Sequence, residues 1–75
     1  MGQYWQATEY YARAIAGARE HGYIQEEALA NELAAKFYLS LGKEKFAQIY
    51  LTESYYGYAR WGATAKLKQL EEKYT

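Results

Sequence analysis

The sequence contains no cysteine, no proline and no aspartate, and it has a single histidine, His21. Without cysteine, the chain forms neither disulfide bonds nor thiolate metal sites. Its longest apolar runs cover a few residues, whereas a helix that crosses a bilayer needs about 20. The first residues, Met-Gly-Gln-Tyr-Trp, lack the basic stretch and the apolar block of a signal peptide. We therefore expect a soluble, cytoplasmic chain with no membrane partner.

An excess of charge of either sign is also missing, because nine Lys and Arg side chains balance nine acidic ones and the formal net charge is zero. Nucleic-acid binding depends on positive charge that neutralises phosphates, so we expect no nucleic-acid partner. At 75 residues, the chain has room for one small domain, over 1–75. A domain of this size buries only about 60% of the surface of its unfolded chain, so a core on its own is marginal.

The residues that are abundant favour helices and large contact surfaces. Ala, Glu, Lys, Leu, Gln and Arg are strong helix formers. The chain also carries ten tyrosines, two tryptophans and two phenylalanines, which together make 19% of the residues. Aromatic side chains supply much contact area for each residue that is ordered. This composition predicts an ordered, all-α protein.

Three glycines, Gly22, Gly42 and Gly62, lie at an even spacing of 20 residues. Glycine just past a helix end accepts the left-handed backbone that a C-terminal cap requires. The spacing therefore predicts four helices of similar length, over about 3–21, 24–41, 44–61 and 63–74. Short connections make consecutive helices antiparallel neighbours. We expect two antiparallel hairpins stacked as a right-handed α-solenoid fragment.

Each expected helix carries apolar residues at spacings of three and four, which predict its buried face. The faces comprise Tyr4, Ala7, Thr8, Tyr11, Ile15 and Ala18 in the first helix; Leu29, Leu33, Phe37 and Leu41, flanked by Ala30, Ala34 and Tyr38, in the second; Ala47, Tyr50, Leu51, Ser54 and Tyr58, widened by Phe46, Ile49 and Tyr56, in the third; and Ala63, Leu67, Leu70 and Tyr74 in the fourth. Gly57 interrupts the third helix, which indicates either a close neighbour or little need for packing there.

One stretch of the chain resembles a tetratricopeptide repeat. It runs from Ala34-Ala35-x-x-Tyr38 through Gly42 to Ala47-x-x-x-Leu51 and Ser54, in the register of that family's small and aromatic positions. Asn31 departs from the family's pattern at the usual tryptophan, and Ala59 stands in place of the terminating proline. The resemblance covers 27–61 and implies a helical hairpin that binds or joins other proteins.

Two further segments, Asn31-Glu32-Leu33-Ala34-Ala35-Lys36-Phe37-Tyr38 and Tyr55-Tyr56-Gly57-Tyr58-Ala59-Arg60-Trp61-Gly62-Ala63, look like the helical stalk of multidomain bacterial sensor kinases. In those proteins the stalk lies between an ATPase module and sensor domains. The resemblance implies a scaffold without chemistry of its own, present here as a fragment of a larger signalling protein. An engineered or idealised repeat protein with no natural ligand is the alternative interpretation.

Residues suited to catalysis do not form a recognisable set. His21 lies at a predicted helix end, where its ring suits the last carbonyl groups. Neither Ser40 nor Ser54 has an evident activating base. Adjacent glutamates, which point to different sides of a helix, occur at Glu26–Glu27 and Glu71–Glu72. We expect no enzyme activity, no metal, no cofactor and no small-molecule substrate.

Protein–protein contact is the remaining class of function. The tetratricopeptide register places candidate groove residues on the second helix at Glu32, Lys36, Leu39 and Ser40. Aromatic residues on several sides of the first and third helices indicate a surface that self-associates, with a dimer as the simplest product. The candidate self-association residues are Tyr4, Trp5, Tyr10, Tyr11, Tyr55, Tyr56 and Trp61.

Overall fold

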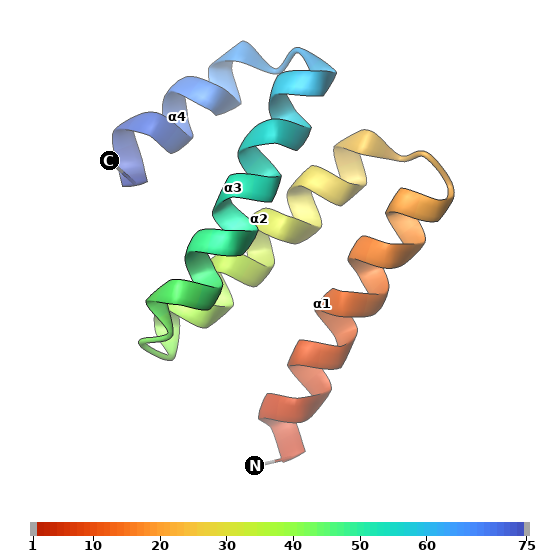
Figure 1. The fold of residues 1–75 in the computed structure, drawn as a ribbon, viewed down its shortest axis with the longest axis vertical. Coiled ribbons are helices and arrows are strands. Elements are labelled where there is room, and N and C mark those ends of the chain that lie inside the picture. The colour runs from red at the N-terminus through yellow and green to blue at the C-terminus, as the bar shows by residue number, and fades with distance from the viewer. Residues whose placement is uncertain (1, 75) are drawn as a thin grey trace.

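The computed structural model describes residues 2–74, with side chains from Trp5 onward. It contains α1 (Gly2–Glu20), α2 (Ile24–Ser40), α3 (Glu44–Trp61) and α4 (Thr64–Tyr74), and no strand within this described range. Consecutive helices run in opposite directions and α1 and α4 form opposite edges of the molecule (Figure 1). The all-α prediction is confirmed, and each predicted helix boundary lies within one residue of the observed one.

The three turns between the helices share one hydrogen-bonded geometry. Gly22, Gly42 and Gly62 have φ angles of +73°, +74° and +86°, in the left-handed region. In each turn the amide after the glycine donates to the carbonyl five residues earlier: Tyr23 to Ala18 at 2.8 Å, Lys43 to Tyr38 at 2.9 Å and Ala63 to Tyr58 at 2.9 Å. This pattern is the Schellman cap, in which glycine avoids a steric penalty. The even spacing of glycines therefore does mark equal helix-plus-turn units.

The most extensive helix contact joins α2 and α3 and is built from small side chains. Ala28 and Ala35 of α2, and Ala47 and Ser54 of α3, are completely buried. A Cβ atom placed on Gly57 would lie 2.8 Å from the Ala28 Cβ, closer than two such atoms approach in proteins. Gly57 is thus explained by the close approach of a neighbouring helix. The most extensive contact, between α2 and α3, therefore joins one expected hairpin to the other. The solenoid stacking of the hairpins stays a prediction.

The buried face of α2 matches the prediction only in part. The flanking residues Ala30, Ala34 and Tyr38 are buried as predicted, but the row of Leu29, Leu33 and Leu41 is exposed, and Ala28, Asn31 and Ala35 are buried in its place. Alanines let the α2 and α3 backbones approach closely, whereas a leucine row at the contact would hold them apart. The prediction followed hydrophobicity, but the observed contact follows side-chain size. In α3, Phe46, Ile49 and Tyr56, which were expected to widen the buried face, are likewise exposed.

Two small clusters form the core, one at each side of the central helix pair. The first contains Ile15, Ala30 and Ala34, with Tyr11, Ala14 and Tyr50 packed against them. The second contains Ala28, Tyr58 and Leu70, with Tyr55, Ala63, Leu67 and Tyr74 around them. The inward faces predicted for α3 at Ala47, Ser54 and Tyr58, and for α4, are confirmed. The Cα atoms span 37 × 31 × 14 Å, so the molecule is a thin slab whose interior never lies far from solvent.

Candidate interaction surfaces

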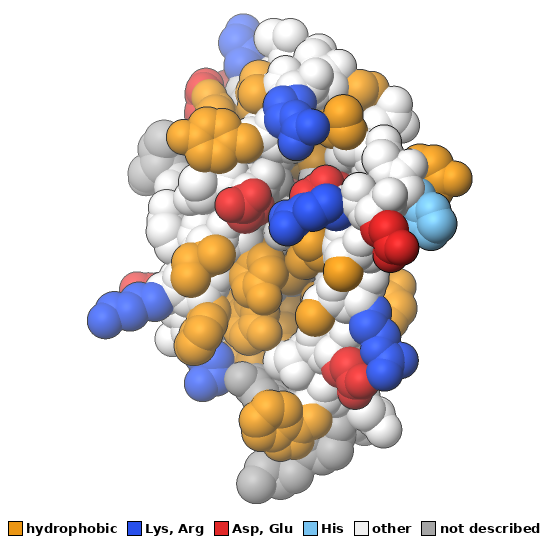
Figure 2. All heavy atoms as spheres, turned by 45° about the vertical axis from the view of Figure 1, so that its right-hand side comes forward, with side chains coloured by type: hydrophobic (Ala, Val, Ile, Leu, Met, Phe, Trp, Pro, Cys, Tyr) orange, Lys and Arg blue, Asp and Glu red, His pale blue; other side chains and the backbone are white. Residues whose placement is uncertain are grey.

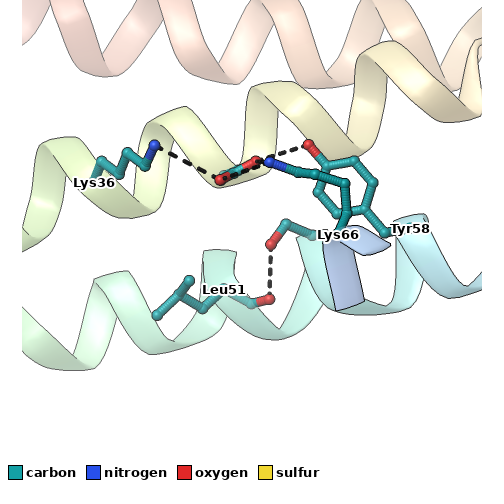
Figure 3. A network of polar contacts seen from close by, with 6 residues as sticks. Lys36, Leu51, Tyr58 and Lys66 are labelled. Atoms are coloured by element: carbon teal, nitrogen blue, oxygen red, sulfur yellow. Dashed lines mark hydrogen bonds and ion pairs between the residues drawn. The ribbon is translucent and has the colours of Figure 1, made fainter. Parts of the chain in front are cut away.

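A buried polar cluster links three helices around the carboxylate of Glu32, which is 5% exposed. The Tyr58 hydroxyl donates a hydrogen bond of 2.7 Å to it from α3. The Lys66 ammonium on α4 lies 3.1 and 3.3 Å from its two oxygens. Lys36, one turn along α2, lies 3.7 Å away on the side opposite Tyr58 (Figure 3). The cluster therefore ties α4 and α3 to α2 through a single side chain.

The protonation of this cluster follows from its geometry. Burial raises the pKa of the Glu32 carboxyl, but the hydrogen bonds from Tyr58 and Lys66, together with the charges of Lys66 and Lys36, outweigh it and lower the pKa overall. Burial and the hydrogen bond to the Glu32 carboxylate raise the pKa of Tyr58 well above its usual range. Glu32 is thus ionised and Tyr58 neutral at pH 7. Both carboxylate oxygens have internal partners, so the cluster serves to hold the helices together.

The four candidate groove residues do not share one surface. Glu32 is enclosed in the buried cluster, and Lys36 lies beside it with its side chain half-exposed. Leu39 and Ser40 are exposed at the C-terminal end of α2. The Ser40 hydroxyl donates to the Phe37 carbonyl at 2.6 Å. The structure therefore brings Glu32 and Lys36 together and leaves the other two apart from them.

The aromatic residues proposed for self-association occupy three places. Trp5 and Tyr10 are 68% and 67% exposed on α1. Tyr55 and Tyr56 border a groove between α3 and α4, where the Tyr55 hydroxyl donates to Glu71 at 2.7 Å. Trp61 is exposed beside the turn that joins α1 and α2. Of the remaining two, Tyr11 is half-buried against Phe37, and the Tyr4 side chain lies outside the described residues.

A row of aromatic rings that was not predicted also crosses the molecule from α1 to α3. The Tyr11 ring lies 5.5 Å from Phe37, and Phe37 lies 5.3 Å from Tyr38. Tyr38 stacks on Tyr50 at 5.3 Å with an interplanar angle of 6°, and on Phe46 at 5.6 Å. Figure 2 shows hydrophobic side chains gathered in a shallow hollow near the middle of one face. The equal distance of Tyr38 and Phe46 from Gly42 was the available signal, because a tight turn pairs such positions.

A second apolar groove follows the α1–α2 pair. It is lined by Tyr10, Tyr11 and Ala14 from α1, and by Glu26, Leu29, Ala30 and Leu33 from α2. Leu29 and Leu33 are 49% and 42% exposed there. Both leucines were expected in the core, so this surface was not predicted. Their i, i+4 spacing placed them on one face of α2, as observed, but the prediction that this face is buried is wrong.

Chemical features of other kinds are few in the part of the chain that the structure covers. Over these residues, His, Cys, Asp and Glu side chains do not gather in groups of three that would hold a metal ion. Nor does any helix there combine the length and the apolar character that crossing a membrane requires.

The chain is similar to a curated protein from Dictyostelium discoideum described as hybrid signal transduction histidine kinase G. The two are 46% identical over 54 residues, which make up 72% of this chain. The chain spans only about 2% of the length of that relative. No protein-family model matches the sequence, and no solved structure matches it. The chain is therefore an all-helical unit similar to a short part of a histidine kinase.

Proposed function

We propose that this chain is a non-catalytic protein-interaction module that serves as a scaffold within a larger signalling protein. The observation that carries the proposal is the amount of large apolar side chain left outside a thin fold. Trp5, Tyr10, Ile49, Tyr56 and Trp61 are all exposed by about half or more. Exposed apolar area of this kind marks surfaces that other proteins cover.

The similarity to a histidine kinase supports the signalling part of this proposal. The matched stretch is a very small part of a protein whose description names signal transduction. A unit of four helices with a core of alanines is suited to join or space neighbouring domains. Its buried polar side chains, Asn31, Glu32 and Ser54, are hydrogen-bonded within the chain. The central α2–α3 pair would act as a tetratricopeptide-like hairpin, with its Ala28–Gly57 contact providing the close helix approach of that family.

The partner that covers these faces would be protein, either another part of a larger signalling chain or a second copy of this one. Self-association is the form open to direct test. Sedimentation equilibrium over a range of micromolar concentrations should give a mass above the 8.7 kDa of a single chain. A Tyr56→Lys variant should shift the association to higher concentration, because it places a charge on an exposed apolar site.

The matched control is Gln69→Lys, which adds the same charge at an exposed polar position of α4 that lines neither the α3–α4 groove bordered by Tyr56 nor the α1–α2 groove. It should alter association less than Tyr56→Lys does. A mass of 8.7 kDa at every concentration would remove self-association from the proposal. Contact with other proteins would then be tested by titration with helical peptides.

A further inference from the structure

The face of α3 that packs on α2 recurs on α1. Ala47, Tyr50, Ser54 and Gly57 lie along α3, and Ala7, Tyr10, Ala14 and Gly17 stand 40 positions before them. Both helices end in the same glycine turn, at Gly22 and Gly62. The two helices therefore present equivalent faces in equivalent positions relative to the turn that follows each.

The α3 copy of this face is fully covered, whereas the α1 copy is covered in part, at Ala14. Ala47 and Ser54 are fully buried, and a Cβ on Gly57 would collide with Ala28. On α1, a Cβ on Gly17 would meet no atom within 4 Å. Tyr10 is largely exposed, whereas Tyr50 stacks on Tyr38. Since α1 forms an edge of the molecule (Figure 1), the part of its equivalent face around Tyr10 and Gly17 has no helix of this chain against it, whereas Ala14 packs at the border of that face against the Ile15 cluster.

The way α2 sits on α3 and α4 shows what such a helix would contact. Ala28 of α2 packs with Tyr58 and Leu70, and Glu32 of α2 pairs with Lys66. Forty positions earlier, Leu70 and Lys66 correspond to Ala30 and Glu26. Ala30 and Glu26 both line the open groove along α1 and α2. The groove is therefore the counterpart of the α3–α4 surface on which α2 rests.

We infer that the groove formed by α1 and α2 binds an amphipathic helix of α2-like character, antiparallel to α1. Its occupant carries alanine opposite Gly17, aliphatic side chains against Leu29 and Leu33, and a lysine or arginine that reaches Glu26. The basic residue follows from charge complementarity. In the chain, the acidic Glu32 of α2 pairs with the basic Lys66, and in the groove the position equivalent to Lys66 is the acidic Glu26. The residue of the bound helix that is equivalent to Glu32 should therefore be basic. This inference rests on the proposed function and specifies one of its surfaces and the chemistry of the partner.

The exposed helix α4 of a second copy of this chain is not the helix that binds in the groove. On α4, the position equivalent to Ala28 is Lys68, and Glu71 and Glu72 lie beside it. A lysine opposite Gly17 would hold the helices apart, and acidic residues would face Glu26. The polar α4 therefore closes its end of the molecule, whereas α1 and α2 leave the other end open to a different helix.

The test is a titration of the chain with synthetic peptides of residues 23–42, at a concentration where sedimentation shows a monomer. The peptide carrying Glu32→Lys should bind, and more tightly than the unmodified peptide. In the chain, Glu26→Lys should reverse that preference. Gly17→Leu should weaken binding by about tenfold or more, as overfilled helix contacts do.

Ala16→Leu is the matched control, because Ala16 is exposed on α1 and corresponds to the exposed Tyr56. It should leave peptide affinity unchanged. Gly17 has open space around it, so circular dichroism should show that Gly17→Leu remains folded. A peptide that binds equally to the Gly17→Leu chain, for example by displacing α2, would overturn the inference, and so would a lack of binding. A chain that self-associates yet ignores the peptide would retain the proposed function and lose this groove.

Discussion

At the scale of single residues, Glu32 shows how a charged side chain becomes part of a helical core. Its carboxylate is buried. It accepts a hydrogen bond from the Tyr58 hydroxyl of α3 and forms an ion pair with Lys66 of α4. A buried charge with its partners in place is tolerated, but it becomes costly when a partner is removed. The stability of the contact among three helices therefore depends on the Tyr58 hydroxyl and on the ionised state of Glu32.

Replacing Tyr58 with phenylalanine tests the first of these dependencies. The ring stays buried while the 2.7 Å hydrogen bond to Glu32 is lost. We expect the free energy of unfolding to fall by about 1–3 kcal/mol, because a charged acceptor loses a donor. Urea denaturation measures the change. Tyr56→Phe is the control, since Tyr56 is exposed, and it should have little effect; equal stabilities for the two variants would contradict the role given to Tyr58.

Acid should weaken the fold through Glu32. Its pKa is lower in the folded chain than in the unfolded one, so the unfolded state binds the proton more readily. The stabilisation is complete above the ordinary glutamate pKa of about 4.3 and is lost as the pH falls through the lower folded value. Thermal unfolding from pH 7 to pH 2 should show this loss. A Glu32→Gln variant should be less stable at pH 7 and should show a smaller dependence on pH in the acid range.

At the scale of helices, α1, α2 and α3 are rods of 17 to 19 residues, each closed by the same glycine turn, and the even spacing of Gly22, Gly42 and Gly62 predicted them; α4 is shorter, with 11 residues. The choice of contact face in α2 was not predictable in the same way. Leu29 and Leu33 are the more hydrophobic candidates, yet Ala28 and Ala35 make the contact because the partner helix offers Gly57 and Ala47. Which face is used depends on the shape of the neighbour, and one helix does not encode that shape.

The groove along α1 and α2 illustrates the same limit for the site. Tyr10 and Tyr11 were recognised as candidates for contact, because aromatic residues stood on more than one side of a helix. The leucines that complete the groove were assigned to the core, and Glu32 was assigned to a surface. Burial of Glu32 depends on Tyr58 and Lys66, which lie 26 and 34 positions further along the chain.

The two mid-helix glycines, Gly17 and Gly57, make a matched pair for testing helix contact. Gly57→Ala places a methyl group 2.8 Å from the Ala28 Cβ, so we expect a loss of about 1–3 kcal/mol in stability despite better helix propensity. Gly17→Ala meets open space and should gain about 0.5–1 kcal/mol. Chemical denaturation of both variants checks this. Opposite signs are expected, and a gain at both positions would contradict the close α2–α3 contact.

At the scale of the whole molecule, the four helices form a slab about two helices thick, whose Cα atoms span 14 Å in the shortest direction. A slab of this kind encloses alanines well but leaves large side chains on its broad faces and edges. The chain's two tryptophans, Trp5 and Trp61, are both exposed. We therefore expect these exposed aromatic residues to form surfaces that a protein partner covers.

Acrylamide quenching of Trp5 and Trp61 across a concentration series tests this claim most directly. In dilute solution both indoles should be readily quenched, because the structure leaves them exposed. As concentration rises into the range where the chain associates, quenching should fall as the indoles are covered. Quenching that is weak even at high dilution, or that stays high and constant while the measured mass rises above that of one chain, would contradict the account.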